Sequence, residues 1–360
     1  MKIAIVSPLF ESVPPKLYGG TERVVSYLTE ELVRQGHDVT LFASGDSVTR
    51  ARLRPMCEQS LRLDPTCVDP FTHHLLMMDQ VMDAAGQFDV VHFNLDYWQF
   101  PMTRRLRMPA VTTLHGRLDL PEFVRVYSHF REAPLVSISN AQRAPIPHNR
   151  WLATIHHGLP PDLYRLHEKR GSYLAFLGRI SPEKRPDRAI LIARRAGIPL
   201  KIAAKVDNAD KQYFEERIRP LLREPGVEFI GEIGEAEKDE FLGGALALLF
   251  PIDWPEPFGL VMIEAMACGT PVIAWRCGSV PEIMTQGITG FIVQTEDEAV
   301  AAVRDVHKLS RKRCRDVFER RFTVGRMARD YLRVYSQVAH DSADGPTTPP
   351  RGSVRRLHAA

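Results

Sequence analysis

Two glutamates, Glu256 and Glu264, stand eight residues apart in the segment PIDWPEPFGLVMIEAMACGTPVIAWRCGSVPE. Pro255 and Pro257 flank the first glutamate, and a residue before proline is pushed out of the helical region, so Glu256 is expected in extended backbone. A helix is predicted to begin near Gly259. The free amides of a helix start attract an anion, and a carboxylate on each side can accept hydrogen bonds from sugar hydroxyls. This combination suits a nucleotide sugar.

A pair of cations, Arg179 and Lys184, lies in the segment GRISPEK, which follows an apolar strand and precedes a helix. Ligands of parallel α/β sheets bind at the carboxyl ends of the strands, and this turn places one forked and one point cation there. A diphosphate is the ligand that these two cations would fit. A solvated basic turn is the alternative interpretation.

Both segments resemble the signatures of the retaining glycosyltransferases of family 4, which share the two-domain GT-B fold. The E-x7-E spacing of Glu256 and Glu264, the linking residues PFGL and EAMACGTPVIA, and the following GSVPEI carry the resemblance. GRISPEK is similar to the family's G-R-x4-K phosphate clamp. The resemblance covers nearly the whole chain apart from its tail. It implies transfer of a hexose from a nucleoside diphosphate sugar, with a UDP-sugar expected, to an acceptor hydroxyl with retention of configuration.

The resemblance also implies a role for each of these side chains. Arg179 and Lys184 would hold the diphosphate, Glu264 would accept the two ribose hydroxyls, and Glu256 would lie beside the donor sugar. Backbone groups are expected to complete the donor site, at Ile233 for the base and at Phe258, Gly259 and Leu260 for the sugar.

Further candidates lie in the first half of the chain. Gly19 and Gly20 resemble the glycine loop that lets backbone approach the donor phosphates or the acceptor, with a plain flexible turn as the alternative. His115 ends the strand AVTTLHG and resembles the family position where a histidine touches the sugar. Asp119 and Asn140 are carried over from the same edge. The residues predicted to be catalytic are His115, Glu256, Arg179 and Lys184.

Neither a metal nor a cofactor is expected. The pairs His73-His74 and His156-His157 are interpreted as structural, because adjacent side chains point in different directions and no third ligand has matching spacing. The chain also has no D-x-D motif of the kind that metal-dependent glycosyltransferases use. The two cations of the GRISPEK turn would neutralise the leaving diphosphate instead.

Length and composition set the broad class. A chain of 360 residues exceeds the size at which one core keeps growing, so two domains are expected. The net charge of +3 argues against a nucleic-acid surface, and the five cysteines form no disulfide or zinc pattern. The short apolar start fits neither a signal peptide nor a membrane span, so a cytoplasmic location is expected. Peripheral membrane contact stays open, because many relatives use lipid acceptors.

Strands and helices alternate in both halves, which predicts two doubly wound, Rossmann-like α/β domains that face a central cleft. Neither half contains a dinucleotide or P-loop motif. The resemblance implies that the final helix returns to the first domain. The predicted parts are an acceptor-side domain at 1–160, a nucleotide-sugar-binding domain at 171–322, the returning helix at 323–340 and a disordered tail at 341–360.

Three other functions fit the same pattern. A GT-B epimerase of sugar nucleotides or a phosphorylase would use a similar donor site, and a catalytically silent module would only bind the nucleotide sugar. The acceptor itself is left open between a saccharide, a lipid-linked sugar and a small molecule, since no transferable motif marks its site.

Overall fold

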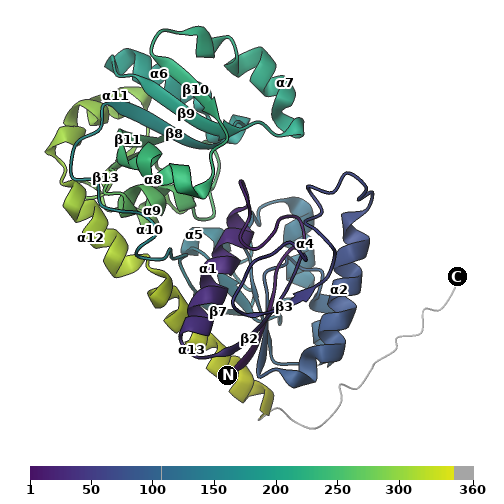
Figure 1. The fold of residues 1–360 in the computed structure, drawn as a ribbon. Helices are drawn as coiled ribbons and strands as arrows, with labels where there is room; N and C mark the ends of the chain where they lie inside the picture. The colour runs from purple at the N-terminus through teal and green to yellow at the C-terminus, as the bar shows by residue number, and fades with distance from the viewer. Residues whose placement is uncertain (107, 344–360) are drawn as a thin grey trace, which may run out of the picture.

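The structure is a computed structural model that describes residues 1–106 and 108–343. It contains two parallel β-sheets, each flanked by helices, and confirms the predicted pair of doubly wound domains (Figure 1). Most of the predicted disordered tail, from 344 onward, lies outside the described residues. The last described helix continues to residue 343.

The sheet of the first domain has seven strands in the order β3-β2-β1-β4-β5-β6-β7. These strands are β1 (Lys2–Val6), β2 (Asp38–Ala43), β3 (Arg52–Pro55), β4 (Val90–Phe93), β5 (Ala110–Thr113), β6 (Leu135–Ser137) and β7 (Trp151–Thr154). The helices of this domain are α1 (Gly20–Arg34), α2 (Pro70–Ala84), α3 (Phe100–Leu106), α4 (Pro121–His129) and α5 (Asn140–Arg143).

The sheet of the second domain has six strands in the order β10-β9-β8-β11-β12-β13. These strands are β8 (Tyr173–Arg179), β9 (Leu200–Lys205), β10 (Val227–Gly231), β11 (Ala245–Phe250), β12 (Val272–Trp275) and β13 (Gly290–Val293). The helices are α6 (Pro186–Ala196), α7 (Lys211–Tyr213), α8 (Glu235–Gly243), α9 (Leu260–Ala267), α10 (Val280–Ile283), α11 (Glu296–Asp305) and α12 (Arg311–Arg321).

The charged segment between Asp210 and Leu222 is predicted from the sequence to form one helix, and this prediction is wrong in its form. The charged segment 210–222 is not one α-helix but a short α7, a π-helical turn at Phe214–Ile218 and a 3-10 turn at Leu221–Arg223. Pro220 has no N–H and its ring clashes with the preceding turn, so an α-helix cannot run through this position.

Strand order reverses at one place in each sheet, between β1 and β4 in the first and between β8 and β11 in the second. Loops that leave such neighbouring strands part in opposite directions, and they open a crevice at the carboxyl ends of the strands. The four loops at these two reversals are 7–19, 94–99, 180–185 and 251–259. They carry five of the residues predicted from the sequence, which are Gly19, Lys184, Glu256, Phe258 and Gly259.

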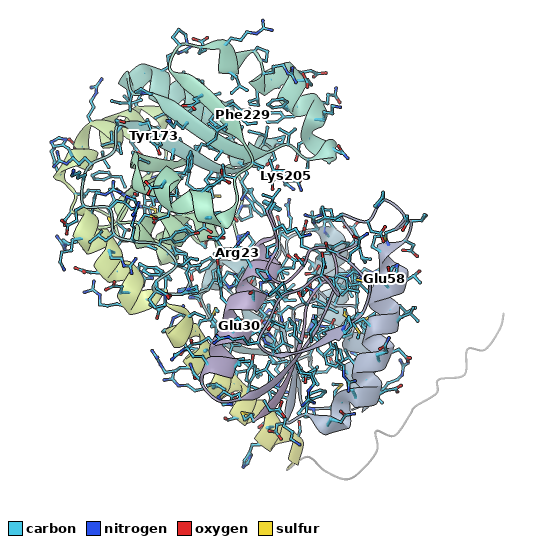
Figure 2. All side chains as sticks on the ribbon, viewed as in Figure 1. Arg23, Glu30, Glu58, Tyr173, Lys205 and Phe229 are labelled. Atoms are coloured by element: carbon cyan, nitrogen blue, oxygen red, sulfur yellow. The ribbon has the colours of Figure 1, made fainter. Side chains whose placement is uncertain are left out.

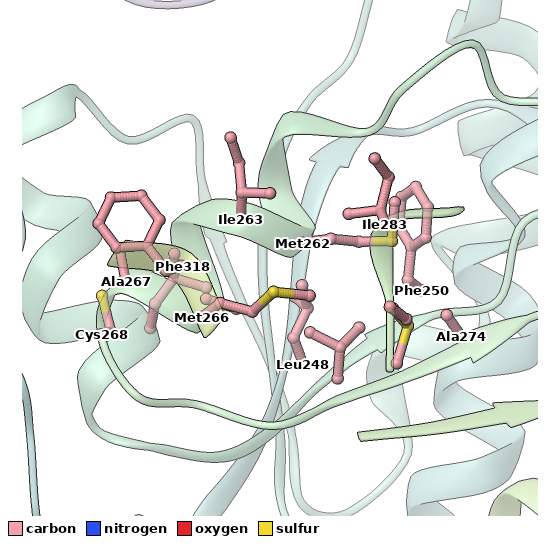
Figure 3. Packing of buried hydrophobic residues seen from close by; sticks show 14 of the residues in the cluster. Leu248, Phe250, Met262, Ile263, Met266, Ala267, Cys268, Ala274, Ile283 and Phe318 are labelled. Carbon is pink, nitrogen blue, oxygen red and sulfur yellow. The ribbon is translucent and has the colours of Figure 1, made fainter. Parts of the chain in front are cut away.

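Helix α9 is fixed by apolar packing along its length. Met262, Ile263 and Met266 are fully buried, and they pack with Leu248 of β11 and Phe318 of α12 (Figure 3). A helix that is apolar on several sides is stable only inside a core, and this one lies between the sheet and α12. The loop before α9 therefore has a rigid support.

The final helix, α13 (Val324–Ala343), leaves the second domain and packs against the first (Figure 1). The Tyr331 hydroxyl lies 2.9 Å from Thr113 Oγ1 of β5, and the Tyr335 hydroxyl lies 2.8 Å from His92 Nδ1 of β4. Both tyrosines are buried, so this contact belongs to the core of the first domain.

Two further observations bear on the surroundings of the protein. Within residues 1–106 and 108–343, no helix is both long and apolar enough to cross a membrane. All five cysteines are free thiols.

Candidate active site

A cleft of about 570 Å³ opens between the two domains at the carboxyl ends of both sheets. All of the predicted catalytic and donor-binding residues line it. They are Gly19, Gly20, His115, Arg179, Lys184, Ile233, Glu256, Phe258, Gly259, Leu260 and Glu264. The cleft thus brings together residues from both domains that are far apart in the sequence.

The first glutamate of the E-x7-E pair meets the lysine of the GRISPEK turn. Lys184 Nζ forms an ion pair with the Glu256 carboxylate, and Trp254 Nε1 donates a hydrogen bond of 2.9 Å to Glu256 Oε2. The lysine ammonium also lies 5.0 Å from the centre of the Trp254 ring, within cation–π range. Glu256 is only 8% exposed, so these contacts are needed to hold its charge in place.

Arg179 is surrounded by carboxylates. Its guanidinium lies 2.6 Å from Glu183, 3.6 Å from Asp207 and 3.4 Å from Asp210. An arginine held on several sides keeps a fixed orientation, and its planar fork suits the oxygens of a phosphate. The turn therefore presents an oriented cation to the cleft, beside Lys184.

Glu264 is the polar exception in the apolar helix α9, and it is 2% exposed. Its Oε1 accepts a hydrogen bond of 2.9 Å from Lys238 Nζ of α8. Its Oε2 is buried and has no hydrogen-bond partner among the residues that the structure describes. One carboxylate oxygen of Glu264 is therefore available to a ligand hydroxyl in the cleft.

His115 is held as a neutral ring. Asn94 Nδ2 donates to the Val6 carbonyl at 3.3 Å, which turns Asn94 Oδ1 toward His115 Nε2 at 3.0 Å. Burial lowers the pKa of His115 to about 4, so the ring is neutral. Because Nε2 faces the Asn94 oxygen, an acceptor, the single ring proton is assigned to Nε2, and Nδ1 is then an acceptor. Nδ1 has no partner in the described chain. The ring stacks on His157, with centroids 5.4 Å apart and planes at 15°.

Glycines allow the close approaches at the cleft. A Cβ on Gly19 would lie 2.7 Å from the Pro15 side chain, which is too close, whereas one on Gly20 would make an ordinary contact, 3.7 Å from Leu260 of the other domain. Gly259 caps α9 in the left-handed region, at φ 79°. The predicted helix start is thereby located at the residue that the sequence indicated.

The loop before α1 and the first turn of α1 join the first domain to the second. Arg23 forms an ion pair with Glu235 of α8, and the Tyr18 amide donates to Glu232 Oε1 at 3.0 Å. Arg23 and Lys205 lie at the facing ends of the two domains in Figure 2. Polar contacts therefore hold the two halves of the cleft together, and they are made by segments that also line the cleft.

Comparison with known proteins agrees with this geometry. The family model for glycosyl transferases group 1 matches residues 165–321, and the model for Glycosyltransferase Family 4 matches residues 18–142. The chain belongs to the group 1 glycosyltransferases. It is 26% identical to the D-inositol 3-phosphate glycosyltransferase of Mycolicibacterium smegmatis. The alignment, 407 positions long with its gaps, covers 94% of this chain and 91% of the relative. Matches to two further curated relatives span only 47% and 28% of their length.

Solved structures of other glycosyltransferases share the fold of this one. AviGT4, a glycosyltransferase involved in avilamycin A biosynthesis, has a TM-score of 0.72 at 24% identity, over 94% of this chain and 98% of that one. Anabaena Alr3699/HepE in complex with UDP has a TM-score of 0.72 at 19% identity, over 94% of this chain and 100% of that one. At these identities the likeness shows the GT-B fold.

Two candidates from the sequence do not line the cleft of this glycosyltransferase. Asp119 is turned to its neighbour Arg117, with an ion pair of 2.7 Å. The Asn140 amide accepts from Thr154 and donates to Glu282 of the second domain. Both residues lie at the predicted sheet edge, but their side chains contact other side chains that do not line the cleft.

One histidine of each adjacent pair, His74 and His156, contacts backbone groups or a carboxylate in the glycosyltransferase. His74 uses both ring nitrogens, since Leu9 N donates to Nε2 at 3.0 Å and Nδ1 lies 2.7 Å from the Pro70 carbonyl. His156 Nε2 lies 3.5 Å from Glu282. No group of three or more potential metal ligands occurs among the described residues.

Sequence reasoning missed many residues of the cleft, among them Glu22, Asp96, Trp98 and Lys238. Asp96 and Trp98 follow β4 at the same strand edge as His115, which was a usable signal. Glu22 stands two residues after the glycine pair, where a charged residue at a helix start looks merely exposed. Lys238 has no signal at all, because its partner Glu264 lies 26 residues away.

Proposed function

We propose that this glycosyltransferase moves a hexose from a UDP-sugar to an acceptor hydroxyl, with retention of anomeric configuration and without a divalent ion. One observation carries the proposal. Arg179, the Lys184–Glu256 pair and the unpartnered Oε2 of Glu264 all line one cleft, so a single donor that carries a phosphate, a sugar and a ribose can meet all of them.

The donor is assigned by its chemical parts. Arg179 and Lys184 bind the diphosphate, and Glu264 Oε2 accepts a ribose hydroxyl while Lys238 holds Oε1. Ile233 binds the base through its backbone. Uracil is favoured because the fold matches that of Anabaena Alr3699/HepE, which was solved in complex with UDP.

Transfer is proposed to follow a front-face route. The bond from the anomeric carbon to the diphosphate breaks, the acceptor oxygen forms its bond on the same face, and its proton passes to the departing phosphate oxygen. Glu256 is engaged by Lys184 and Trp254, so it is suited to stabilise positive charge on the sugar ring rather than to attack it. His115 Nδ1 accepts a hydroxyl of the donor sugar.

Positive charge for the leaving group comes from side chains in this proposal. Lys184 and Arg179 lie beside the phosphate position and are already oriented by their carboxylate partners, so they can neutralise the diphosphate without a metal. A cytoplasmic location is also proposed, because five free thiols are typical of a reducing compartment.

Proton NMR of the reaction tests the proposal. The protein is incubated with UDP-glucose, UDP-galactose or UDP-N-acetylglucosamine and a panel of sugar acceptors, in buffer with EDTA. Release of UDP together with a product of α configuration is expected from at least one donor. A β-configured product would contradict retention, and activity that EDTA removes and magnesium or manganese restores would contradict metal independence. Epimerised donor without acceptor, or cleavage that needs phosphate, would reveal one of the other GT-B activities.

A further inference from the structure

The first-domain side of the cleft contains two carboxyl groups that the donor chemistry does not use. Glu22 of α1 and Asp96 of the loop after β4 both line the cleft. Glu22 is 6% exposed, and no side chain in the described parts of the chain forms a hydrogen bond or ion pair with it. Asp96 is exposed to the cleft and likewise lacks such a partner among the described residues.

Every cation that lines the cleft already has a carboxylate partner. The pairs are Arg23–Glu235, Arg62–Glu11, Arg179–Glu183, Lys184–Glu256, Lys205–Asp207 and Lys238–Glu264. In the described part of the cleft, the groups left over are therefore carboxyls rather than cations. Outside the donor phosphate site, these unpaired carboxyl groups offer no positive charge to a second anion in the cleft.

Two aromatic rings line the same cleft as the two carboxyls. Phe10 and Trp98 line the cleft and are half-buried. Trp98 is held edge-on by Phe71, at 5.5 Å and 88°, and by His74, at 4.8 Å and 74°. The Phe10 ring lies 4.9 Å from His74. These contacts fix the rings, so they offer rigid apolar surface to a ligand.

Resting on the proposed function, we infer that Phe10, Glu22, Asp96 and Trp98 form an acceptor pocket for an uncharged, hydroxyl-rich saccharide or glycoside rather than a phosphorylated one. The C–H faces of a sugar pack on aromatic rings, and its hydroxyls donate to carboxyl oxygens. Glu22 has a backbone hydrogen bond but no side-chain partner among the described residues, so an acceptor hydroxyl would satisfy the remaining capacity of its buried carboxyl. A phosphate in the same place would meet two carboxyls and no free cation.

Matched acceptor pairs test the inference with the full chain. Glucose, mannose, N-acetylglucosamine and myo-inositol are each compared with their monophosphate, with the donor that proves active, and the products are quantified by mass spectrometry. The neutral member of a pair is expected to have a kcat/KM about tenfold or more above its phosphorylated partner. A higher kcat/KM for the phosphorylated member would overturn the acceptor pocket.

Substitutions locate the effect. Glu22→Gln and Asp96→Asn are expected to lower kcat/KM for the neutral acceptor by about tenfold, because each removes a carboxyl oxygen that accepts from an acceptor hydroxyl. Asp96→Lys is expected to shift the preference toward the phosphorylated member of the pair. Asp83→Asn, an exposed aspartate of α2, serves as the matched control. Unchanged acceptor selectivity in Asp96→Lys would also overturn the inference.

Binding of UDP separates the two proposals. Calorimetric titration of each variant with UDP shows whether it is folded and whether its donor site is intact. If wild-type protein does not bind UDP, the proposed function fails. If UDP binds with the wild-type affinity while phosphorylated acceptors are preferred, the acceptor pocket alone is refuted.

Discussion

The two sides of the cleft differ in how their charges are arranged. On the donor side, formed by Arg179, Lys184, Lys238, Glu256 and Glu264, every charge is paired within the second domain. On the other side, Glu22 and Asp96 remain without a side-chain partner. Paired charges orient groups for a ligand of fixed chemistry. Unpaired carboxyls leave room for a partner that supplies its own hydrogen-bond donors.

The largest expected effect is the loss of turnover when Lys184 on the donor side is replaced. Lys184→Ala removes a phosphate cation and leaves the buried Glu256 carboxylate without its ion pair. Loss of one such electrostatic group is expected to lower kcat by about 100-fold to 1000-fold. Steady-state UDP release measures it.

Lys201→Ala is the matched control, because this lysine pairs with Glu228 on the surface, away from the cleft. It should retain the wild-type rate. Unchanged donor kinetics in Lys184→Ala would remove the lysine from the phosphate site and would leave the donor side without its main cation.

Substitutions of the two glutamates of the E-x7-E pair are expected to change different kinetic parameters. Glu264→Gln weakens the contact with ribose and should raise the donor KM by about tenfold. Glu256→Gln weakens charge stabilisation at the sugar and should mainly lower kcat, by about 100-fold. Initial rates over a range of donor concentrations separate the two parameters. Equal changes in both parameters for both variants would contradict this division of labour.

A smaller effect is expected where the first domain touches the donor side. Arg23→Met removes the buried cation that pairs with Glu235, and Tyr164 and Lys238 remain near that carboxylate. Unfolding free energy should fall by about 3 kcal/mol, as is usual when a buried pair is broken. Urea unfolding measures it.

Arg34→Met is the control for this substitution, since the Arg34 guanidinium is exposed on α1 and its partner Glu31 keeps a hydrogen bond from Gln35. Its loss should lower the unfolding free energy much less than the loss of Arg23. Equal losses of unfolding free energy in the two variants would show that the Arg23 contact does not stabilise the folded protein.

The smallest effect concerns the charge of Glu22. Burial raises the pKa of Glu22 from 4.5 to about 7, with Glu11 adding to the shift and Arg62 and Arg23 opposing it. Between pH 4.5 and about 7 the folded protein holds a proton that the unfolded chain has lost, so stability falls as pH rises through this window.

Glu22→Gln cannot titrate, so its Tm relative to wild type should rise by a few degrees from pH 5 to pH 8. Differential scanning calorimetry at several pH values measures the difference. Glu122→Gln, at an exposed position of α4, should show no such trend. A Tm difference that is independent of pH would mean that Glu22 is not protonated in the folded protein.

The groups of the donor side could be placed at the cleft from the sequence because they lie in continuous segments. The prolines and Gly259 indicated where α9 begins, and the alternation of strands and helices is met here by β11, α9 and β12 (Val272–Trp275). The doubly wound alternation then placed the turns at one edge of each sheet.

Contacts between distant segments could not be predicted in the same way. The Tyr18 amide and Glu232 are separated by 214 residues, and Lys238 meets Glu264 only after α8 and α9 pack on the sheet. Short polar β3 lacks an apolar run, so no strand was predicted there. These features depend on tertiary packing rather than on local pattern.

Calorimetric titration with UDP tests the central claim most directly, since it needs neither the acceptor nor the sugar. Wild-type protein is expected to bind one UDP per chain, Lys184→Ala is expected to bind it about tenfold or more weakly, and Lys201→Ala should match the wild type. Absence of binding to the wild type, or equal affinity in Lys184→Ala, would contradict a diphosphate site at the GRISPEK turn.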